Sequence, residues 1–94
     1  MDAESHIYPR QDELGLLGAC LLGGVDTAID VVASVPNDAI FSDDIRATYS
    51  LIERLATDGS ACDQAAVGRE WKRVHDGTPA PIALWSSAME VCPS

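Results

Sequence analysis

The residues of this chain with the greatest potential for chemistry are its carboxylates, two histidines and three cysteines. Two pairs of adjacent acids, Asp12-Glu13 and Asp43-Asp44, contain the residue types used in general acid–base catalysis. Adjacent residues on a helix point in different directions, and each pair falls where a helix is expected to begin and where its dipole favours negative charge. We therefore interpret both pairs as helix-initiating residues and predict no catalytic residue.

Metal and nucleotide sites need patterns that this sequence lacks. Neither His6 nor His75 has a second histidine at helical spacing, and the cysteines form no Cys-x-x-Cys pair. The glycines are not followed by the lysine of a phosphate-binding loop. We predict no metal, no cofactor and no enzymatic activity. Buried thiols in the reducing cytoplasm are the expected state of Cys20, Cys62 and Cys92.

The charge balance limits the partners that the chain can bind. Fifteen acidic against six basic residues leave a formal net charge of −9. Phosphate backbones and anionic membranes attract clustered Lys and Arg, and the nearest approach to a cluster is Arg69, Lys72 and Arg73. The longest apolar stretch, Leu14 to Leu22, is too short and too rich in glycine to span a bilayer. We predict no direct nucleic-acid contact, no membrane contact and a basic protein partner.

Length and composition predict one helical domain. The 94 residues, 47% of them hydrophobic, suffice for a single core. We predict an all-α fold, a compact bundle of about five to six short helices over residues 9–94, after a flexible N-terminal arm at residues 1–8. Caps and breakers locate five helices: from Pro9 to Gly23-Gly24, from Asp26 or Thr27 to Val35, from Ser42 to Gly59, from Asp63 to Gly77, and from Pro81 to Pro93.

Apolar periodicity then assigns the inward faces of these helices. The stripe of the first contains Gly15 and Gly18, which we expect to allow close approach of a neighbouring helix. Phe41, just before the third, is placed to pack back onto its first turns as a hydrophobic staple. The fourth and fifth are expected to bury Val67, Trp71 and Val74, and Ile82, Trp85, Ala88 and Met89.

The two tryptophans allow two interpretations. Trp71 and Trp85 fall in phase with apolar neighbours, which is typical of core residues. Tryptophan is also enriched at interface hot spots, and little chain follows the last helix to cover it. On this second interpretation the candidate protein interface consists of Trp85, Met89 and Trp71, with Trp85 as the main anchor.

The order of these features resembles the N-terminal domain of DnaB-type replicative DNA helicases. In that family a proline precedes a helix with the pattern Glu-x-x-x-Leu-Gly-x-x-Leu-Leu. The matching residues here are Pro9, Glu13, Leu17, Gly18, Leu21 and Leu22. Family segments around Asp-Phe-Tyr and His-Arg-x-Ile-Phe are similar to residues 39–41 and 45–49, with Ala39 and Ile45 in place of the aspartate and histidine. Later matches are Gly59, Asp63 and Pro93-Ser94.

The resemblance implies a role without catalysis. In the family this domain forms the collar of a hexameric helicase, where it pairs with other helicase subunits and receives the C-terminal region of primase. A separate motor domain hydrolyses ATP. The family's dimer-forming helical hairpin is missing here, so we expect a chain that is monomeric or only weakly dimeric at micromolar concentration, measured by light scattering. Two alternatives stay open: a freestanding helical adaptor or phage or plasmid replication accessory protein, and a small enzyme of unrecognised type.

Overall fold

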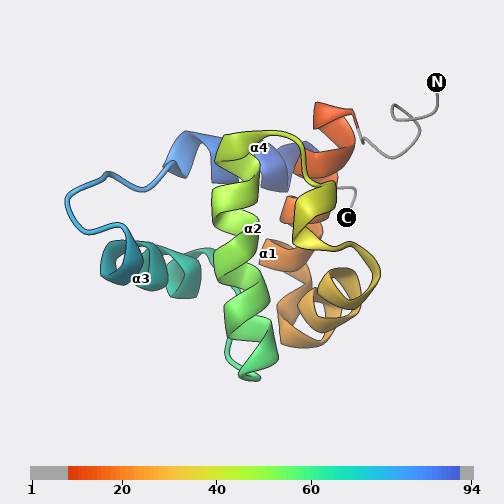
Figure 1. Cartoon of the computed structure of the whole chain (residues 1–94), viewed down its shortest axis with the longest axis horizontal. Coiled ribbons are helices and arrows are strands. Elements are labelled where there is room, and N and C mark those ends of the chain that lie inside the picture. The colour runs from red at the N-terminus through yellow and green to blue at the C-terminus, as the bar shows by residue number, and fades with distance from the viewer. Residues whose placement is uncertain (1–8, 92–94) are drawn as a thin grey trace.

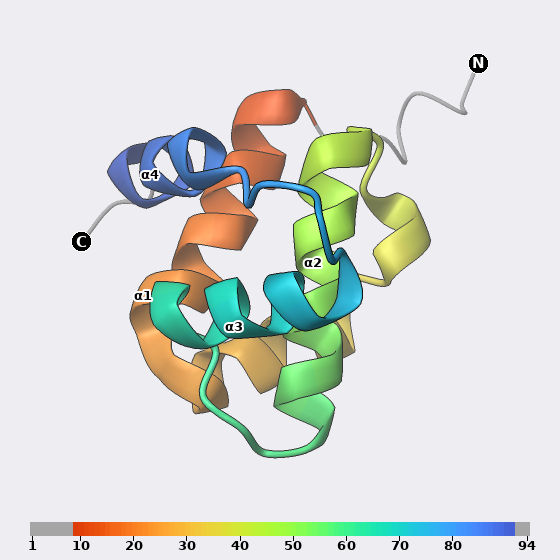
Figure 2. The ribbon, with the colours of Figure 1, turned by 90° about the vertical axis from the view of Figure 1, so that its left-hand side faces the viewer.

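Four α-helices and a 3-10 turn make up the described part of the chain, residues 9–91 of a computed structural model (Figure 1). They are α1 (Arg10–Ser34), η2 (Asn37–Ala39), α2 (Asp43–Thr57), α3 (Gln64–Val74) and α4 (Ile82–Val91). In Figure 1, α2 stands in the middle, α4 passes behind its upper part, and α1 runs along its right-hand side. Figure 2 shows α3 crossing in front of α2. The all-α prediction is confirmed, whereas the predicted arm at residues 1–8 and the predicted break at Pro93 lie outside the described residues.

The first two predicted helices are joined in α1 by a kink. Gly24, inside α1, has φ 84° and ψ 178°, a backbone conformation that glycine adopts far more readily than other residues. A Cβ atom at Gly23 would lie 2.7 Å from the side chain of Thr27. The glycine pair therefore bends the helix where we expected it to end, and the described residues form four helices and a 3-10 turn rather than five to six helices.

One cluster of apolar side chains, drawn from all four helices, forms the core. Its largest fully buried members are Trp85, Tyr49, Leu17, Ile40, Ile45 and Ile52. Three expectations about helix faces are wrong. Val74 is 40% exposed, because it is the last residue of α3, which packs chiefly on α2. Ile82 is 48% exposed, because it is the first residue of α4, one turn before the buried Trp85. Nothing lies within 4 Å of a Cβ atom placed on Gly15, so close approach does not require this glycine, whereas Gly18 is buried.

Glu13 of α1 is a fully buried carboxylate that holds the start of α2. It accepts hydrogen bonds from the backbone amide of Phe41 at 2.6 Å and from that of Ser42 at 3.3 Å. Ser42 occupies the N-cap position, as predicted, but its side chain makes no capping hydrogen bond. In a capping box, a glutamate three residues after the N-cap accepts a hydrogen bond from the N-cap amide. In α2 that position is Ile45, and Glu13 of α1 accepts the bond from the Ser42 amide instead.

The predicted staple at Phe41 is wrong, because the inward position at this point of the chain belongs to Ile40. Ile40 is 1% exposed, whereas Phe41 is 68% exposed. By contrast, the predicted cap at Asp63 is confirmed, since its side chain accepts a 2.9 Å hydrogen bond from the amide of Ala66.

Tyr49 of α2 closes the other end of α1. Its buried hydroxyl donates to the carbonyl oxygen of Val35 at 2.6 Å and lies 3.3 Å from that of Val31. The last carbonyl groups of a helix lack partners within the helix, so a hydroxyl from a neighbouring helix satisfies them. Glu13 and Tyr49 therefore join α1 and α2 near both ends of α1.

By length and mean hydropathy alone, α1 could cross a bilayer. In the fold it buries Glu13, Leu17 and Leu21 and packs against α2 and α4. The core helices of globular proteins share this composition, and the predicted absence of membrane contact stays a prediction.

The buried carboxylate predicts a large effect of substituting Glu13. Glu13→Ala leaves two backbone donors without their acceptor, so we expect the free energy of unfolding to fall by about 3 kcal/mol. The exposed neighbour provides a control, since Asp12→Ala removes only a favourable charge near a helix N-terminus, worth less than about 1 kcal/mol. Urea denaturation at neutral pH measures both. Equal losses for the two variants would contradict a special role for Glu13.

Candidate protein-interaction surface

Both tryptophans of the predicted interface lie in the core. Trp85 is fully buried, and its indole nitrogen donates to the hydroxyl of Thr48 at 2.9 Å. Trp71 is 7% exposed, and its indole nitrogen donates to the carbonyl oxygen of Thr78 at 2.9 Å. Their ring centroids are 6.3 Å apart in an edge-to-face arrangement, which is favourable for aromatic pairs. Of the two interpretations that the sequence left open, the structure has the one in which both tryptophans are core residues.

The position of α4 explains why Trp85 is not exposed. We expected little cover for the last helix, but α4 packs against α1, which comes from the other end of the chain. Met89 is half-buried and packs against the core cluster, so it is the one residue of the predicted interface with a substantial exposed fraction. Trp85 is therefore not accessible to a partner, whereas Trp71, although mostly buried, lines a groove at the end of α3.

Phe41 is the most exposed large hydrophobic residue in the described part of the chain. It lies between η2 and α2, and the acids Asp43 and Asp44 follow it after Ser42. Asp44 receives two hydrogen bonds from Arg10, at 2.8 and 3.0 Å, which hold the pKa of its carboxyl below the usual value. The Asp43 side chain is 92% exposed and pairs with Arg46 at 2.7 Å. We call residues 41–44 the Phe41 knob. The sequence carries no signal that Phe41 faces outward.

A groove of about 360 Å³ lies between the end of α3 and the segment that leads to α4. Six of its lining residues are Gly68, Trp71, Lys72, His75, Asp76 and Pro79. The imidazole of His75 stacks on Trp71 with 4.1 Å between ring centroids. The bond from Trp71 to Thr78 holds the linking segment against α3. We call this feature the Trp71 groove.

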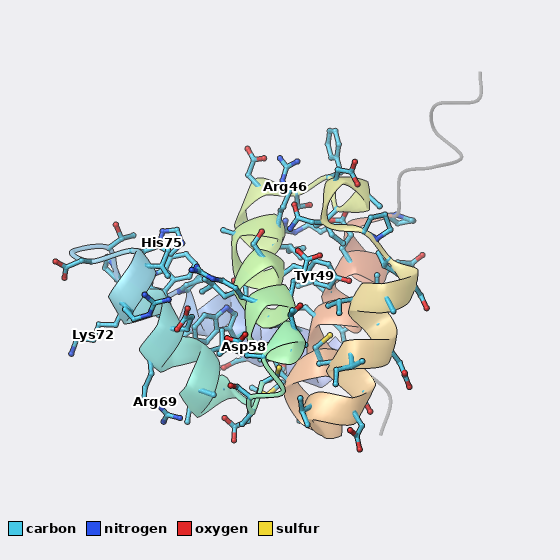
Figure 3. The ribbon with its side chains drawn as sticks, turned by 60° about the horizontal axis from the view of Figure 1, so that its bottom comes forward. Arg46, Tyr49, Asp58, Arg69, Lys72 and His75 are labelled. Carbon is cyan, nitrogen blue, oxygen red and sulfur yellow. The ribbon has the colours of Figure 1, made fainter. Side chains whose placement is uncertain are left out.

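The end of α3 is also where basic side chains gather. Figure 3 shows Arg69 and Lys72 projecting from α3 away from the other helices. Neither makes an ion pair with another described residue, whereas Arg73 and Arg54 both pair with Glu70. Hydrogen bonding from Arg73 lowers the pKa of the Glu70 carboxyl. The groove therefore has unpaired cations beside it in a chain that is otherwise strongly acidic.

Three of the described carboxylates are held in structural contacts. Glu13, Asp44 and Glu70 are engaged with backbone amides or guanidinium groups. Within residues 9–91, no three His, Cys, Asp or Glu side chains are grouped closely enough to hold a metal ion. Cys20 and Cys62 are buried, as predicted, and Cys92 lies outside the described residues. No family model, no curated protein and no solved structure matches the chain.

The buried bond between α4 and α2 yields a second stability prediction. Thr48→Val removes the acceptor of the Trp85 indole and leaves a buried donor unpaired, so we expect a loss of about 2 kcal/mol in the free energy of unfolding. The matched control is Thr57→Val at the exposed end of the same helix, with an expected change within about 0.5 kcal/mol. Thermal and urea denaturation measure both. A loss for Thr48→Val no larger than the control's would show that the bond contributes nothing.

Proposed function

We propose that this chain is the non-catalytic N-terminal collar domain of a replicative DNA helicase, which mediates hexamer assembly and binds the C-terminal region of primase during DNA replication. The observation that carries the proposal is the position of the residues in which the chain resembles DnaB-type helicases. Of the six matching residues at the first helix, Glu13, Leu17, Gly18 and Leu21 are buried, whereas Pro9 and Leu22 are exposed. The four buried residues hold α1 against its neighbours, so most of the resemblance in this helix rests on positions that determine a fold.

The surface supports a role in binding proteins. Phe41, Leu22 and Ile82 expose apolar area that a partner would remove from water. The net charge of −9 favours a basic partner over nucleic acid or an anionic membrane. The proposal accordingly includes the primase C-terminal region and other helicase subunits as partners, no direct contact with DNA or membrane, no cofactor, and a cytoplasmic location.

A freestanding helical adaptor, or a phage or plasmid replication accessory protein, is the second candidate. It is favoured by a departure from the family pattern. Ile45 stands where the family has a histidine, and here it is fully buried in the core. A reading frame that continues into a Gly-x-x-x-x-Gly-Lys-Thr motor would favour the helicase, and one without a motor would favour the adaptor.

Titration calorimetry with the C-terminal region of the primase from the same replicon tests the proposal. We expect saturable binding with a dissociation constant on the order of micromolar, weakened by added salt because the chain is strongly acidic. A basic globular protein of similar size serves as the control for non-specific attraction. Absence of binding between two folded proteins, or equal binding of the control, would contradict primase docking.

A further inference from the structure

The part of α1 after its kink, residues 25–34, has one side in the core and another in solvent. Ala28 is fully buried, whereas the next residue, Ile29, is 41% exposed. Val25 and Val32 lie one turn before and one turn after Ile29, and both are half-buried. These three β-branched side chains therefore form an apolar stripe along about two turns of the helix.

Two carboxylates border this stripe. Asp26 and Asp30 are exposed, lie four residues apart on one side of the helix, and make no ion pair with another described residue. They belong to the most acidic part of the chain, residues 11–45, which contains seven acidic residues and no basic residue. We call Val25, Asp26, Ile29, Asp30 and Val32 the Ile29 face.

Figure 1 shows this part of α1, in gold, at the right-hand edge of the molecule, where no other described helix lies beyond it. We propose that the Ile29 face binds a basic amphipathic helix of a protein partner. The apolar residues of that helix cover the stripe, and its lysines or arginines pair with Asp26 and Asp30.

The stripe has the spacing that a partner helix requires. Packed helices insert ridges of side chains into each other's grooves, and rows of residues three or four apart form those ridges. An amphipathic helix presents anchors at offsets of three or four and seven residues, which match the offsets of four and seven from Val25 to Ile29 and Val32. Valine and isoleucine have few rotamers in a helix, so their burial by a partner costs little side-chain entropy.

Charge selects a basic partner for this face. The basic residues on either side of the acidic segment, Arg10 and Arg46, are both paired with acids at the start of α2. The carboxylates of Asp26 and Asp30 are thus left for cations from outside the described chain. The same negative charge repels acidic proteins, anionic membranes and a second copy of this chain, which carries −9.

The other two surfaces do not select one class of partner. The acids of the Phe41 knob are already paired with arginines, and the Trp71 groove is lined by Lys72 and Asp76, whose charges are opposite. The Ile29 face combines exposed apolar area with carboxylates that no described cation neutralises. The inference rests in part on the proposed function, because it assigns the surface by which a basic partner such as the primase C-terminal region would bind.

A model peptide tests the face without a cognate partner. It has about 18 residues of leucine and lysine in the order of an amphipathic helix, and a control peptide has the same composition in an order without an apolar face. Each is titrated into the nitrogen-15-labelled chain and followed by nuclear magnetic resonance. We expect the largest amide shifts at residues 25–33, a dissociation constant on the order of 100 μM, and binding of the control at least about fivefold weaker. Absence of shifts, largest shifts outside α1, or equal binding of the two peptides would overturn the inference.

A pair of variants tests the apolar stripe. Ile29→Ala removes exposed apolar area from its centre and should weaken peptide binding at least about threefold. The matched control is Val74→Ala at the end of α3, where the side chain is 40% exposed, and it should leave binding unchanged. Equal effects of the two variants would contradict docking on the stripe.

A pair of double variants tests the two carboxylates. Asp26→Asn with Asp30→Asn should weaken peptide binding more than Asp58→Asn with Asp76→Asn, although both change the net charge by the same amount. All four side chains are exposed, so both double variants should fold. Equal losses would show a general attraction between an acidic chain and a basic peptide, and the proposed pairing would be wrong.

The outcome is separable from the test of primase binding. Primase binding without peptide binding at the Ile29 face overturns this inference alone. Peptide binding at the face together with a failed primase titration supports the inference and removes the proposed function.

Discussion

The bond between the Glu13 carboxylate and the chain entering α2 is the contact on which the rest of this fold depends. Glu13 is fully buried, and its two amide partners lie 28 and 29 residues further along the chain. A buried carboxylate without partners costs several kcal/mol, a large share of the stability of a domain this small. The folded chain must therefore make this bond, and making it sets where α2 begins relative to α1.

From that starting point α2 positions the helices on either side of it. Thr48 accepts the indole N–H of Trp85 from α4, and the adjacent Tyr49 donates to Val35 at the end of α1. Apolar contacts tolerate many arrangements of similar volume, whereas hydrogen bonds require particular distances and directions. These buried polar contacts select one packing of α1 and α4 around α2, and the apolar residues around them supply most of the stability.

Local signals in the sequence predicted where helices begin and break. Contacts between distant parts of the chain determine whether a break ends a helix and which side chains are covered. Ser42 and Asp63 marked helix starts correctly, because a cap depends on residues within one turn. Gly23-Gly24 marked a break correctly, but whether a break ends a helix or bends it depends on what the next segment packs against. The sequence likewise left the burial of Trp85 open, because α1 and Thr48, which cover it, are far from it in the sequence. Periodicity identifies an apolar face but not the helix that covers it.

One signal for Glu13 was present in the sequence. Glu13 precedes Leu17 and Leu21 by four and eight residues, so it lies on the apolar face of α1. A carboxylate there requires buried donors, and only the fold reveals that they are the amides of Phe41 and Ser42. With Ile40 turned inward, the same bond leaves Phe41 in solvent. The contact that orders the core thus also orders the most exposed ring of the described surface, so loosening it would release both together.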